Sequence, residues 1–245
     1  MVLVSSLYFL FQENQPPTMI PCTTARNLYK YVFSANPSVA NYLQFANLSQ
    51  TNLSSFTVTM WVKPKNVTAS NKISLLTYKT MLMSGCPAWS ISLTNSQTVL
   101  VKVKGGISTF YADYTSDRYI HVGVTWSIAS NRIQLFINGH LNGARNLTMD
   151  QIQPVMGHGD FYVGQTYFRE LSQREGCAVD TFSTLKGEVS QVYVWDRELS
   201  GTSIANAMWL KAPCEGRILD WDTSSSKYNG TIQISTVSME DFLAL

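Results

Sequence analysis

The four cysteines are the residues of this 245-residue sequence best suited to covalent chemistry: Cys22, Cys86, Cys177 and Cys214. No two of them form a CxxC pair, and zinc sites usually take two ligands from one short turn. The spacing therefore favours long-range disulfides over a zinc site. Disulfides persist in oxidising compartments, so this cysteine pattern favours an extracellular protein.

Five Asn-x-Ser/Thr sequons, which are acceptors for N-linked glycans in secreted proteins, point to the same compartment. They begin at Asn47, Asn52, Asn66, Asn146 and Asn229. Chance predicts roughly three sequons in a chain with this content of Asn, Ser and Thr, so the excess is small. Cysteines and sequons together predict a secreted protein or part of the ectodomain of a membrane protein.

Residues that could catalyse hydrolysis are few and poorly arranged. Asp220 and Asp222 would share one face if Trp221 lies in a strand, as the paired carboxylates of a glycosidase require. Nothing beside them would separate their pKa values, so a solvated strand end is the better interpretation. Three histidines stand at unrelated spacings: His121, His140 and His158. Without a G-x-S-x-G elbow or a phosphate-binding glycine loop, the sequence predicts a protein that is not an enzyme.

Charge and hydropathy exclude further classes. The net charge is +2 and the basic residues are scattered, which argues against a nucleic-acid partner. The apolar run at residues 2–11 is too short to span a bilayer, so no membrane insertion is expected. Its length suits a signal-peptide core, but no basic residues precede it and no A-x-A site follows. Residues 1–24 are interpreted as an N-terminal extension or leader, with a truncated upstream region or an extra strand left open.

The rest of the chain, residues 25–245, is predicted to be one domain with a hydrophobic period of two. Apolar residues alternate with Thr57, Thr59 and Trp61 in the segment 56–62, which predicts a half-buried strand. Segments 119–126 and 133–137 alternate in the same way. The dipeptide Asn138-Gly139 then predicts a type I′ hairpin turn, because both residues tolerate positive φ.

A later segment is apolar on both faces, which predicts a central strand. Val189, Gln191, Tyr193 and Trp195 are expected on one face, and valines on the other: Val192 and Val194. A short helix is expected after Leu199, with Ser200 as its cap and helical spacing at the following apolar positions: Ile204, Ala207 and Met208. Many short strands separated by turn residues predict an all-β fold, a two-sheet antiparallel jelly-roll sandwich with one short surface helix.

Six strings, in order, resemble the pentraxin and laminin-G-like family, whose domains are concanavalin-A-like jelly rolls. They are FTVTMWV at 56–62, YIHVGVTW at 119–126, LFING at 135–139, VGQ at 163–165, GEVSQVYVWD at 187–196 and GRILDW at 216–221. Their order and spacing match the family across residues 25–233. The resemblance identifies a divergent member of this family and implies a module that binds rather than catalyses.

The cysteines depart from the family pattern. The positions of the pentraxin intersheet disulfide hold Thr59 and Gly123, so packing is expected to replace that crosslink. Long pentraxins pair cysteines that match Cys22 and Cys214, which implies a crosslink between the two ends of the domain. The remaining two cysteines lie in the loops that jointly hold calcium in relatives. The hypothesis is that a Cys86–Cys177 disulfide joins these loops and replaces the metal.

The calcium ligands of the family are largely missing. Calcium binds six to eight oxygens, mainly carboxylate and amide. The run after Gln165 is Thr166-Tyr167-Phe168, and the partner loop at 85–88 carries no acid. Only Glu175 and Asp180 remain as candidate metal ligands. No cofactor is expected, and calcium-dependent ligand recognition is disfavoured.

The tryptophans and nearby aromatic residues are the last candidates for ligand contact. Three tryptophans stand in the alternating patterns and are interpreted as core: Trp126, Trp195 and Trp221. The candidate ligand contacts are Trp89, Tyr167 and Phe168, although core packing is favoured for Trp89 as well. The leading expectation is an extracellular recognition or adhesion module that binds a glycan or a protein through its loops without calcium. The alternatives are a calcium-dependent pattern-recognition pentraxin that forms a ring, and a structural subunit that docks other proteins; self-association is considered possible.

Overall fold

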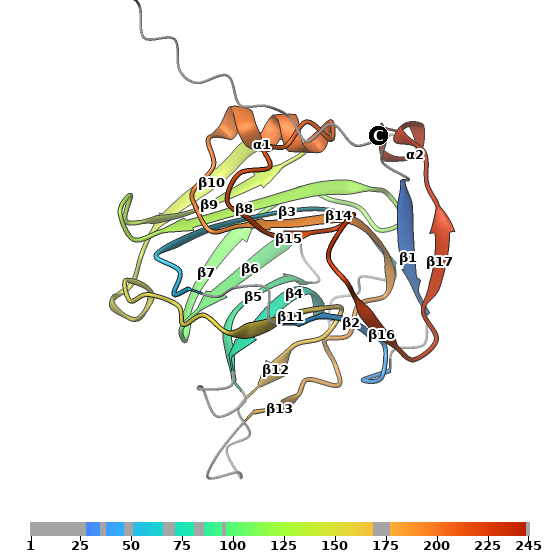
Figure 1. Cartoon of the computed structure of the whole chain (residues 1–245), viewed down its shortest axis with the longest axis horizontal. Helices are drawn as coiled ribbons and strands as arrows, with labels where there is room; N and C mark the ends of the chain where they lie inside the picture. The colour runs from blue at the N-terminus through green and yellow to red at the C-terminus, as the bar shows by residue number, and fades with distance from the viewer. Residues whose placement is uncertain are drawn as a thin grey trace, which may run out of the picture.

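Two antiparallel β-sheets packed face to face make up the body of the protein (Figure 1). The structure is a computed structural model and describes residues 28–34, 38–46, 51–65, 72–80, 86–94, 97–168 and 177–243. The predicted extension at residues 1–24 lies outside these residues. The all-β sandwich expected from the sequence is confirmed.

The eight-stranded sheet has the order β10-β9-β8-β3-β14-β1-β17, with β15 also paired to β14. Its strands are β1 (Tyr29–Phe33), β3 (Ser55–Pro64), β8 (Ile120–Ser127), β9 (Arg132–Ile137), β10 (His140–Asn146), β14 (Gly187–Trp195), β15 (Arg217–Asp220) and β17 (Gln233–Thr236). The seven-stranded sheet has the order β16-β2-β11-β4-β5-β6-β7. Its strands are β2 (Tyr42–Phe45), β4 (Ile73–Thr80), β5 (Pro87–Thr94), β6 (Thr98–Val103), β7 (Gly106–Tyr111), β11 (Gly159–Val163) and β16 (Lys227–Asn229).

Four smaller elements complete the described chain. They are the hairpin of β12 (Tyr167–Phe168) and β13 (Ala178–Val179), the 3₁₀ helix η2 (Met149–Gln151), and the helices α1 (Gly201–Met208) and α2 (Met239–Leu243). Figure 1 shows both α-helices beyond the eight-stranded sheet and the β12–β13 hairpin beyond the seven-stranded sheet. The two outer faces of the sandwich therefore carry different elements.

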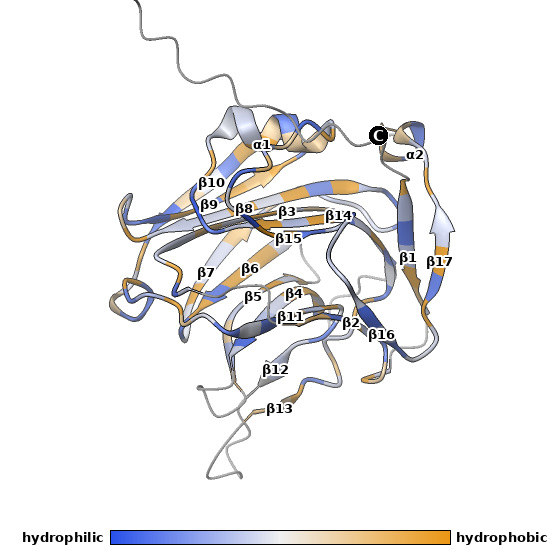
Figure 2. Ribbon diagram, in the orientation of Figure 1, coloured by the Kyte–Doolittle hydropathy of each residue, from blue (hydrophilic) through white to orange (hydrophobic). Residues whose placement is uncertain are grey.

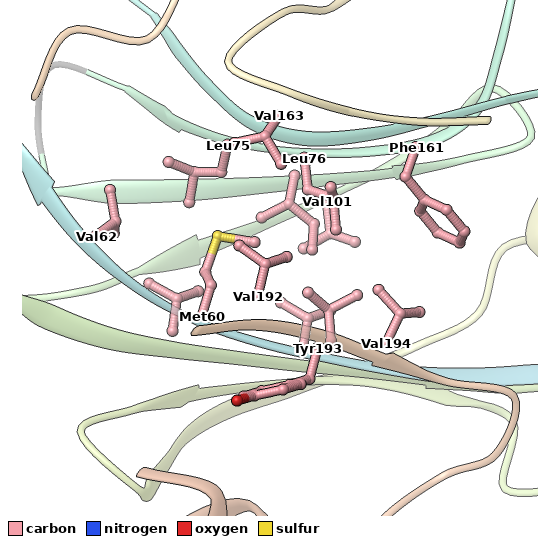
Figure 3. Close-up of a cluster of buried hydrophobic side chains, with 14 of the residues drawn as sticks. Met60, Val62, Leu75, Leu76, Val101, Phe161, Val163, Val192, Tyr193 and Val194 are labelled. Carbon is pink, nitrogen blue, oxygen red and sulfur yellow. The ribbon is translucent and has the colours of Figure 1, made fainter. Parts of the chain in front are cut away.

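The core lies between the two sheets and consists of one cluster of buried apolar side chains. Figure 3 shows Met60 and Val62 of one sheet on the same side as Val192 and Val194, facing apolar residues of the other sheet: Leu75, Leu76, Val101, Phe161 and Val163. Figure 2 shows apolar bands alternating with polar ones along the long strands. This alternation is the periodicity that the sequence displayed, because successive side chains of a strand point to opposite faces.

β14 corrects one sequence prediction. Val62 pairs with Val189 and Val58 pairs with Val194, so both β14 valines face the core together. The register shifts between Ser190 and Tyr193, where Gln191 has a φ of 53°. The β-bulge reverses the alternation. Val189 therefore does not share a face with Tyr193, as strict alternation had predicted, although the central position of the strand is confirmed.

β3 is buried on both faces, so the expectation of a half-buried strand is wrong. Trp61, on the outer face, is 1% exposed because the Phe242 ring of α2 stacks on it at 4.7 Å. Helix α1 was predicted correctly: Ser200 is its N-cap, and its side chain accepts a hydrogen bond from the Ser203 N–H. Helix α2 was not predicted. Its first turn is stabilised by reciprocal hydrogen bonds between Ser238 and Asp241.

The two positions of the missing family disulfide lie opposite each other in one sheet. Thr59 of β3 pairs directly with Gly123 of β8, so a crosslink here would join neighbouring strands and not the two sheets. The expectation of an intersheet position is corrected. A Cβ at Gly123 would lie 2.8 Å from a methyl carbon of Ile204. The glycine thus leaves room for α1, and helix packing occupies the place of the crosslink.

Two other local predictions are confirmed. Asn138 and Gly139 have φ of 48° and 77° and connect β9 to β10 in a tight hairpin. The three tryptophans interpreted as core are buried: Trp126, Trp195 and Trp221. Short-range turn chemistry and strand alternation were sufficient for these features.

Candidate ligand-binding surface

A continuous row of side chains crosses the outer face of the seven-stranded sheet. The strand registers pair Lys227, Gln44, Tyr162, Thr77, Ser90, Lys102 and Ile107 in turn from β16 to β7. Their sequence neighbours Leu43, Phe161 and Val101 belong to the core, so the row faces outward. The row thus carries amide, ammonium and phenol groups at the surface, while its central hydroxyl residues, Thr77 and Ser90, are buried.

Three tyrosines gather at one end of this row and form what we call the tyrosine patch: Tyr42, Tyr162 and Tyr167. The rings of Tyr42 and Tyr162 are 5.8 Å apart, and those of Tyr162 and Tyr167 are 5.7 Å apart and edge-on. The Lys79 ammonium lies 4.2 Å from the centre of the Tyr167 ring. All three rings are half-buried, so each keeps part of its surface available to a ligand.

A small pocket opens beside the tyrosine patch, with a volume of about 150 Å³. Its lining residues come from β4, β11 and the loop before β11: Lys79, Thr80, His158, Gly159, Asp160 and Tyr162. Lys79 and Asp160 are direct partners in the register. The Asp160 carboxylate accepts a hydrogen bond from the Gln44 amide at 2.9 Å. A donor, an acceptor and an aromatic ring therefore converge on one cavity, an arrangement suited to a hydroxylated ligand.

Local backbone geometry sets the shape of this pocket. A Cβ at Gly159 would lie 2.6 Å from both the Lys79 carbonyl oxygen and the Tyr78 ring. The Gly159 N–H donates to the Tyr78 hydroxyl at 3.1 Å. Only glycine allows β11 to approach β4 this closely. The approach brings Asp160 and Lys79 into register.

Burial changes the acidity of the groups around the pocket. Burial raises the pKa of Tyr162 and Tyr167 above the usual value, and neighbouring phenols and the Asp160 charge raise it further. Burial also lowers the pKa of Lys79, which the Asp160 charge opposes. The tyrosines therefore remain neutral hydrogen-bonding groups near pH 7.

A disulfide ties the β12–β13 hairpin to the seven-stranded sheet. Cys86 precedes β5 and Cys177 precedes β13; the two are bonded with their Cα atoms 4.8 Å apart. Tyr167 of β12 pairs with Val179 of β13. The predicted Cys86–Cys177 pairing is present in the structure, and it links the hairpin that carries Tyr167 to the start of β5.

The sequence-predicted ligand contacts have different outcomes. Trp89 is 0% exposed, with its ring stacked on Phe56 at 4.6 Å, so its assignment as a ligand contact is wrong. The cause is strand parity, since Trp89 points to the core while Ser90 points outward. Tyr167 lies in the tyrosine patch. Phe168 lies beside it in β12, and the structure describes only its backbone.

Of the two candidate metal ligands, Asp180 lies in the described chain. Asp180 accepts hydrogen bonds from the Phe182 N–H at 3.1 Å and the Ser183 hydroxyl at 2.5 Å. Glu175 lies outside the described residues. Among the residues that are described, no group of three His, Cys, Asp or Glu side chains could hold a metal ion. Calcium binding remains a prediction on which these residues give no support.

The candidate catalytic carboxylates have structural partners. β15 ends at Asp220, so Trp221 is not in a strand. Asp220 accepts from the Arg217 guanidinium at 2.6 Å, and Asp222 accepts from the Tyr193 hydroxyl at 2.9 Å. Both carboxylates therefore stabilise the turn after β15 and the neighbouring β14.

The three histidines are dispersed. His140 and His158 are exposed, on β10 and at the rim of the pocket. His121 is buried, and its ring centre lies 5.2 Å from that of Trp61, the residue on which α2 packs. Burial lowers the pKa of His121 to about 3. A neutral buried imidazole on the opposite face of the sandwich has no access to the pocket.

The modification sites are described only in part. Asn52, Asn146 and Asn229 are exposed, whereas Asn47 and Asn66 lie outside the described residues. Cys22 also lies outside them, so the Cys22–Cys214 pairing stays a prediction. No helix of the described segments has the length and apolar character needed to cross a membrane.

Sequence reasoning missed most of this candidate surface. Tyr42, Lys79 and Tyr162 were not selected, because each stands alone in its own strand. The only available signal was alternation: Asp160 and Tyr162 flank the core residue Phe161 in β11. Alternation shows that such residues face outward, but it does not show which strands become neighbours.

The fold is that of a lectin-like binding module. Residues 37–205 match the family model described as the concanavalin A-like lectin/glucanases superfamily. The chain belongs to this superfamily, and the resemblance to pentraxin and laminin-G-like domains is confirmed. A comparison with curated proteins found no matching sequence.

Three solved structures illustrate the likeness. The heptameric SAP-like pentraxin of Limulus polyphemus is 16% identical with a TM-score of 0.68, over 87% of this chain and 97% of that one. The extracellular region of zebrafish Gpr126/Adgrg6 is 17% identical with a TM-score of 0.65, over 85% of this chain and 26% of that region. A protein of Bacteroides ovatus assigned to carbohydrate binding is 17% identical with a TM-score of 0.61, over 86% of this chain and 60% of that one. At these identities the likeness shows the fold alone.

Proposed function

We propose that this chain is a non-catalytic, extracellular glycan-binding module whose ligand lies on the outer face of the seven-stranded sheet. The observation that carries the proposal is the tyrosine patch beside a pocket where Lys79 and Asp160 face each other. A sugar offers an apolar ring face and a rim of hydroxyls. The patch supplies ring faces, and the pocket supplies one donor and one acceptor.

Binding on this face would not need calcium. The protein groups of the pocket donate and accept hydrogen bonds directly, and the hairpin is tied to the sheet by a disulfide. Extracellular location is supported by that disulfide, since such bonds persist in oxidising compartments. Of the described acidic residues near the face, Asp160 and Asp180 already accept hydrogen bonds from protein groups.

A glycan array followed by calorimetry on the best glycan tests the proposal. We expect Tyr162→Ala to weaken binding at least about tenfold, which corresponds to about 1.4 kcal/mol. Tyr111→Ala is the matched control, because Tyr111 is an exposed tyrosine of the same sheet on β7, four strands away from β11. We expect Tyr111→Ala to bind like wild type.

The same samples separate the other functions. Binding that survives a chelator is expected here, whereas binding and thermal stability that require added calcium would favour a calcium-dependent pattern-recognition pentraxin. Sedimentation would reveal a ring or a self-associating structural subunit. An array on which no glycan binds would refute the proposed function.

A further inference from the structure

A second pocket, with a volume of about 520 Å³, opens on the outer face of the eight-stranded sheet, between β9 and the start of α1. We call it the β9 pocket. Its floor consists of the outward-facing residues of β9: Arg132, Gln134 and Phe136. Ile133 and Leu135, which alternate with them, belong to the core. The facing wall is the chain that enters α1, residues 198–201, and Leu141 of β10 lines the pocket beside its register partner on β9.

The β9 pocket combines apolar surface with groups that form hydrogen bonds. Phe136 is 4% exposed, whereas Leu141 beside it is 56% exposed. The amide oxygen of Gln134 accepts from a neighbouring threonine hydroxyl at 3.4 Å, and its amide nitrogen has no acceptor among the described residues. The Arg132 guanidinium lies 3.4 Å from the Glu198 carboxylate, which joins the floor to the facing wall. An exposed leucine and a free amide donor therefore lie in one pocket.

Two small residues keep the β9 pocket open. Gly201 is the first residue of α1, and a Cβ there would lie 3.4 Å from the Phe136 ring, an ordinary contact distance. Gly201 is not among the described glycines with positive φ, so its backbone would accept other residues. Ala144 of β10 is the register partner of Gln134 and adds only a methyl group to that side. A larger side chain at Gly201 would lie over the Phe136 ring and fill the pocket.

Asn146 lies at the other end of the floor from Phe136. It is the register partner of Arg132, and such partners have Cβ atoms about 4.5–5.5 Å apart. The neighbouring Arg145 lies over the Phe110 ring of the other sheet at 5.3 Å, so strand alternation directs Asn146 to the outer face. Its side chain is exposed and makes no hydrogen bond to the part of the chain that is described.

Asn146 is also the first residue of a sequon, Asn146-Leu147-Thr148, in which an N-linked glycan is attached to the asparagine side-chain nitrogen. The first two sugars of such a glycan are N-acetylglucosamines, which carry an amide, hydroxyls and an apolar methyl group. From Arg132 to Phe136 the floor runs four residue steps along β9, about 14 Å. An oligosaccharide that starts at Asn146 can therefore extend along the whole floor. The pocket volume is within the range of about 300–1,000 Å³ that is usual for ligands.

We propose that the β9 pocket holds the chain's own glycan on Asn146, with its first two N-acetylglucosamines lying between β9 and the start of α1. Their apolar surfaces cover Phe136 and Leu141, and an acetamido carbonyl accepts from the Gln134 amide. This inference goes beyond the proposed function. It concerns the other sheet, and it takes from that proposal only the extracellular location, where N-linked glycans occur.

The rate at which a peptide-N-glycosidase releases each glycan from the folded chain tests this inference. The whole chain is secreted from mammalian cells, and mass spectrometry measures occupancy and release at Asn146 and Asn229. Asn229 is the matched control, because it is an exposed sequon residue of β16, at the edge of the other sheet. We expect release at Asn146 to be at least about tenfold slower in the folded chain, and to differ by less than about twofold after denaturation.

Filling the β9 pocket should remove this protection. We expect Gly201→Leu to raise the release rate at Asn146 to that at Asn229, because the leucine side chain takes the place of the sugars over Phe136. Thr202→Leu is the control, since Thr202 is the next residue of α1, is exposed and does not line the pocket. It should leave release at Asn146 slow. A cooperative unfolding transition in both variants shows that the comparison is made on folded chains.

Three results would overturn the inference: an Asn146 without glycan in the secreted chain, equally fast release at Asn146 and Asn229 from the folded wild type, or slow release that persists in Gly201→Leu. The proposed function is tested separately, because Asn146→Gln should bind the glycan array like wild type. A chain that binds no glycan on the array but shows slow release at Asn146 refutes the proposed function and supports the present inference.

Discussion

The two outer faces of the sandwich are built from the same kind of strands, but helices pack on only one of them. On the eight-stranded sheet, α2 covers Trp61, α1 packs on Gly123, and Glu188 is surrounded by cations. On the seven-stranded sheet, the tyrosine patch stays half-exposed, and Lys79 and Asp160 face each other beside it. The helix-covered face contributes to stability, while the other face keeps half-exposed aromatic rings and a pocket at one end. The predictions below test this division.

The largest effect is expected from opening the covered face. Phe242→Ala removes a fully buried ring that contacts Trp61 at 4.7 Å and Tyr119 at 5.0 Å. We expect the free energy of unfolding to fall by about 3–5 kcal/mol, as for other buried aromatic residues. Urea unfolding measures it. Glycan affinity, measured at a temperature where the variant is folded, should equal that of wild type. A loss of affinity in this variant would contradict the separation of a stabilising face from a binding face.

Removing the Cys86–Cys177 disulfide, which lies beside the seven-stranded sheet, should lower the free energy of unfolding. Cys86→Ser with Cys177→Ser releases a crosslink between residues 91 positions apart. We expect a loss of about 2–4 kcal/mol in the free energy of unfolding, because the unfolded chain becomes less constrained. Reduced glycan affinity should accompany it, since Tyr167 belongs to the released hairpin. An affinity equal to that of wild type would exclude the hairpin from the binding site.

Neutralising one charge on each face should lower the free energy of unfolding by unequal amounts. Glu188 accepts from Lys30 at 2.8 Å and from Tyr119 at 2.6 Å; burial favours its neutral form, yet these bonds lower its pKa below the usual value. Glu188→Gln should cost about 1.5–3 kcal/mol. Lys102→Gln should change stability by less than about 0.5 kcal/mol. Chemical denaturation compares them, and equal losses would refute the asymmetry.

The buried His121 should make the covered face sensitive to acid. Its pKa is about 3 in the folded protein, against 6.5 for an exposed imidazole. The unfolded state therefore binds a proton more readily, and protonation favours unfolding. Between pH 6.5 and 3 we expect stability to fall by about 1.4 kcal/mol per pH unit from this group. Comparing wild type with His121→Leu isolates the effect, and identical slopes against pH would contradict it.

Much of the fold could be predicted because its signals are local. The Asn138-Gly139 turn and the Ser200 cap depend on a few consecutive residues. The bulge at Gln191 could not be predicted, since it depends on how β14 meets β3. Of the predicted ligand contacts, Tyr167 lies in the tyrosine patch and Trp89 lies in the core. Proximity to Cys86 in the sequence did not indicate the direction in which the tryptophan points.

By itself the sequence determined that this protein is an all-β sandwich with widely spaced cysteines, because strand alternation and turn chemistry act over a few residues. Only the tertiary structure decided which face of each sheet is covered and which side chains meet. Tyr42 and Tyr162 are 120 positions apart, and they touch only because β2 and β11 are neighbours in the sheet. Strand order depends on the packing of the whole core, so the tyrosine patch is a property of the folded chain.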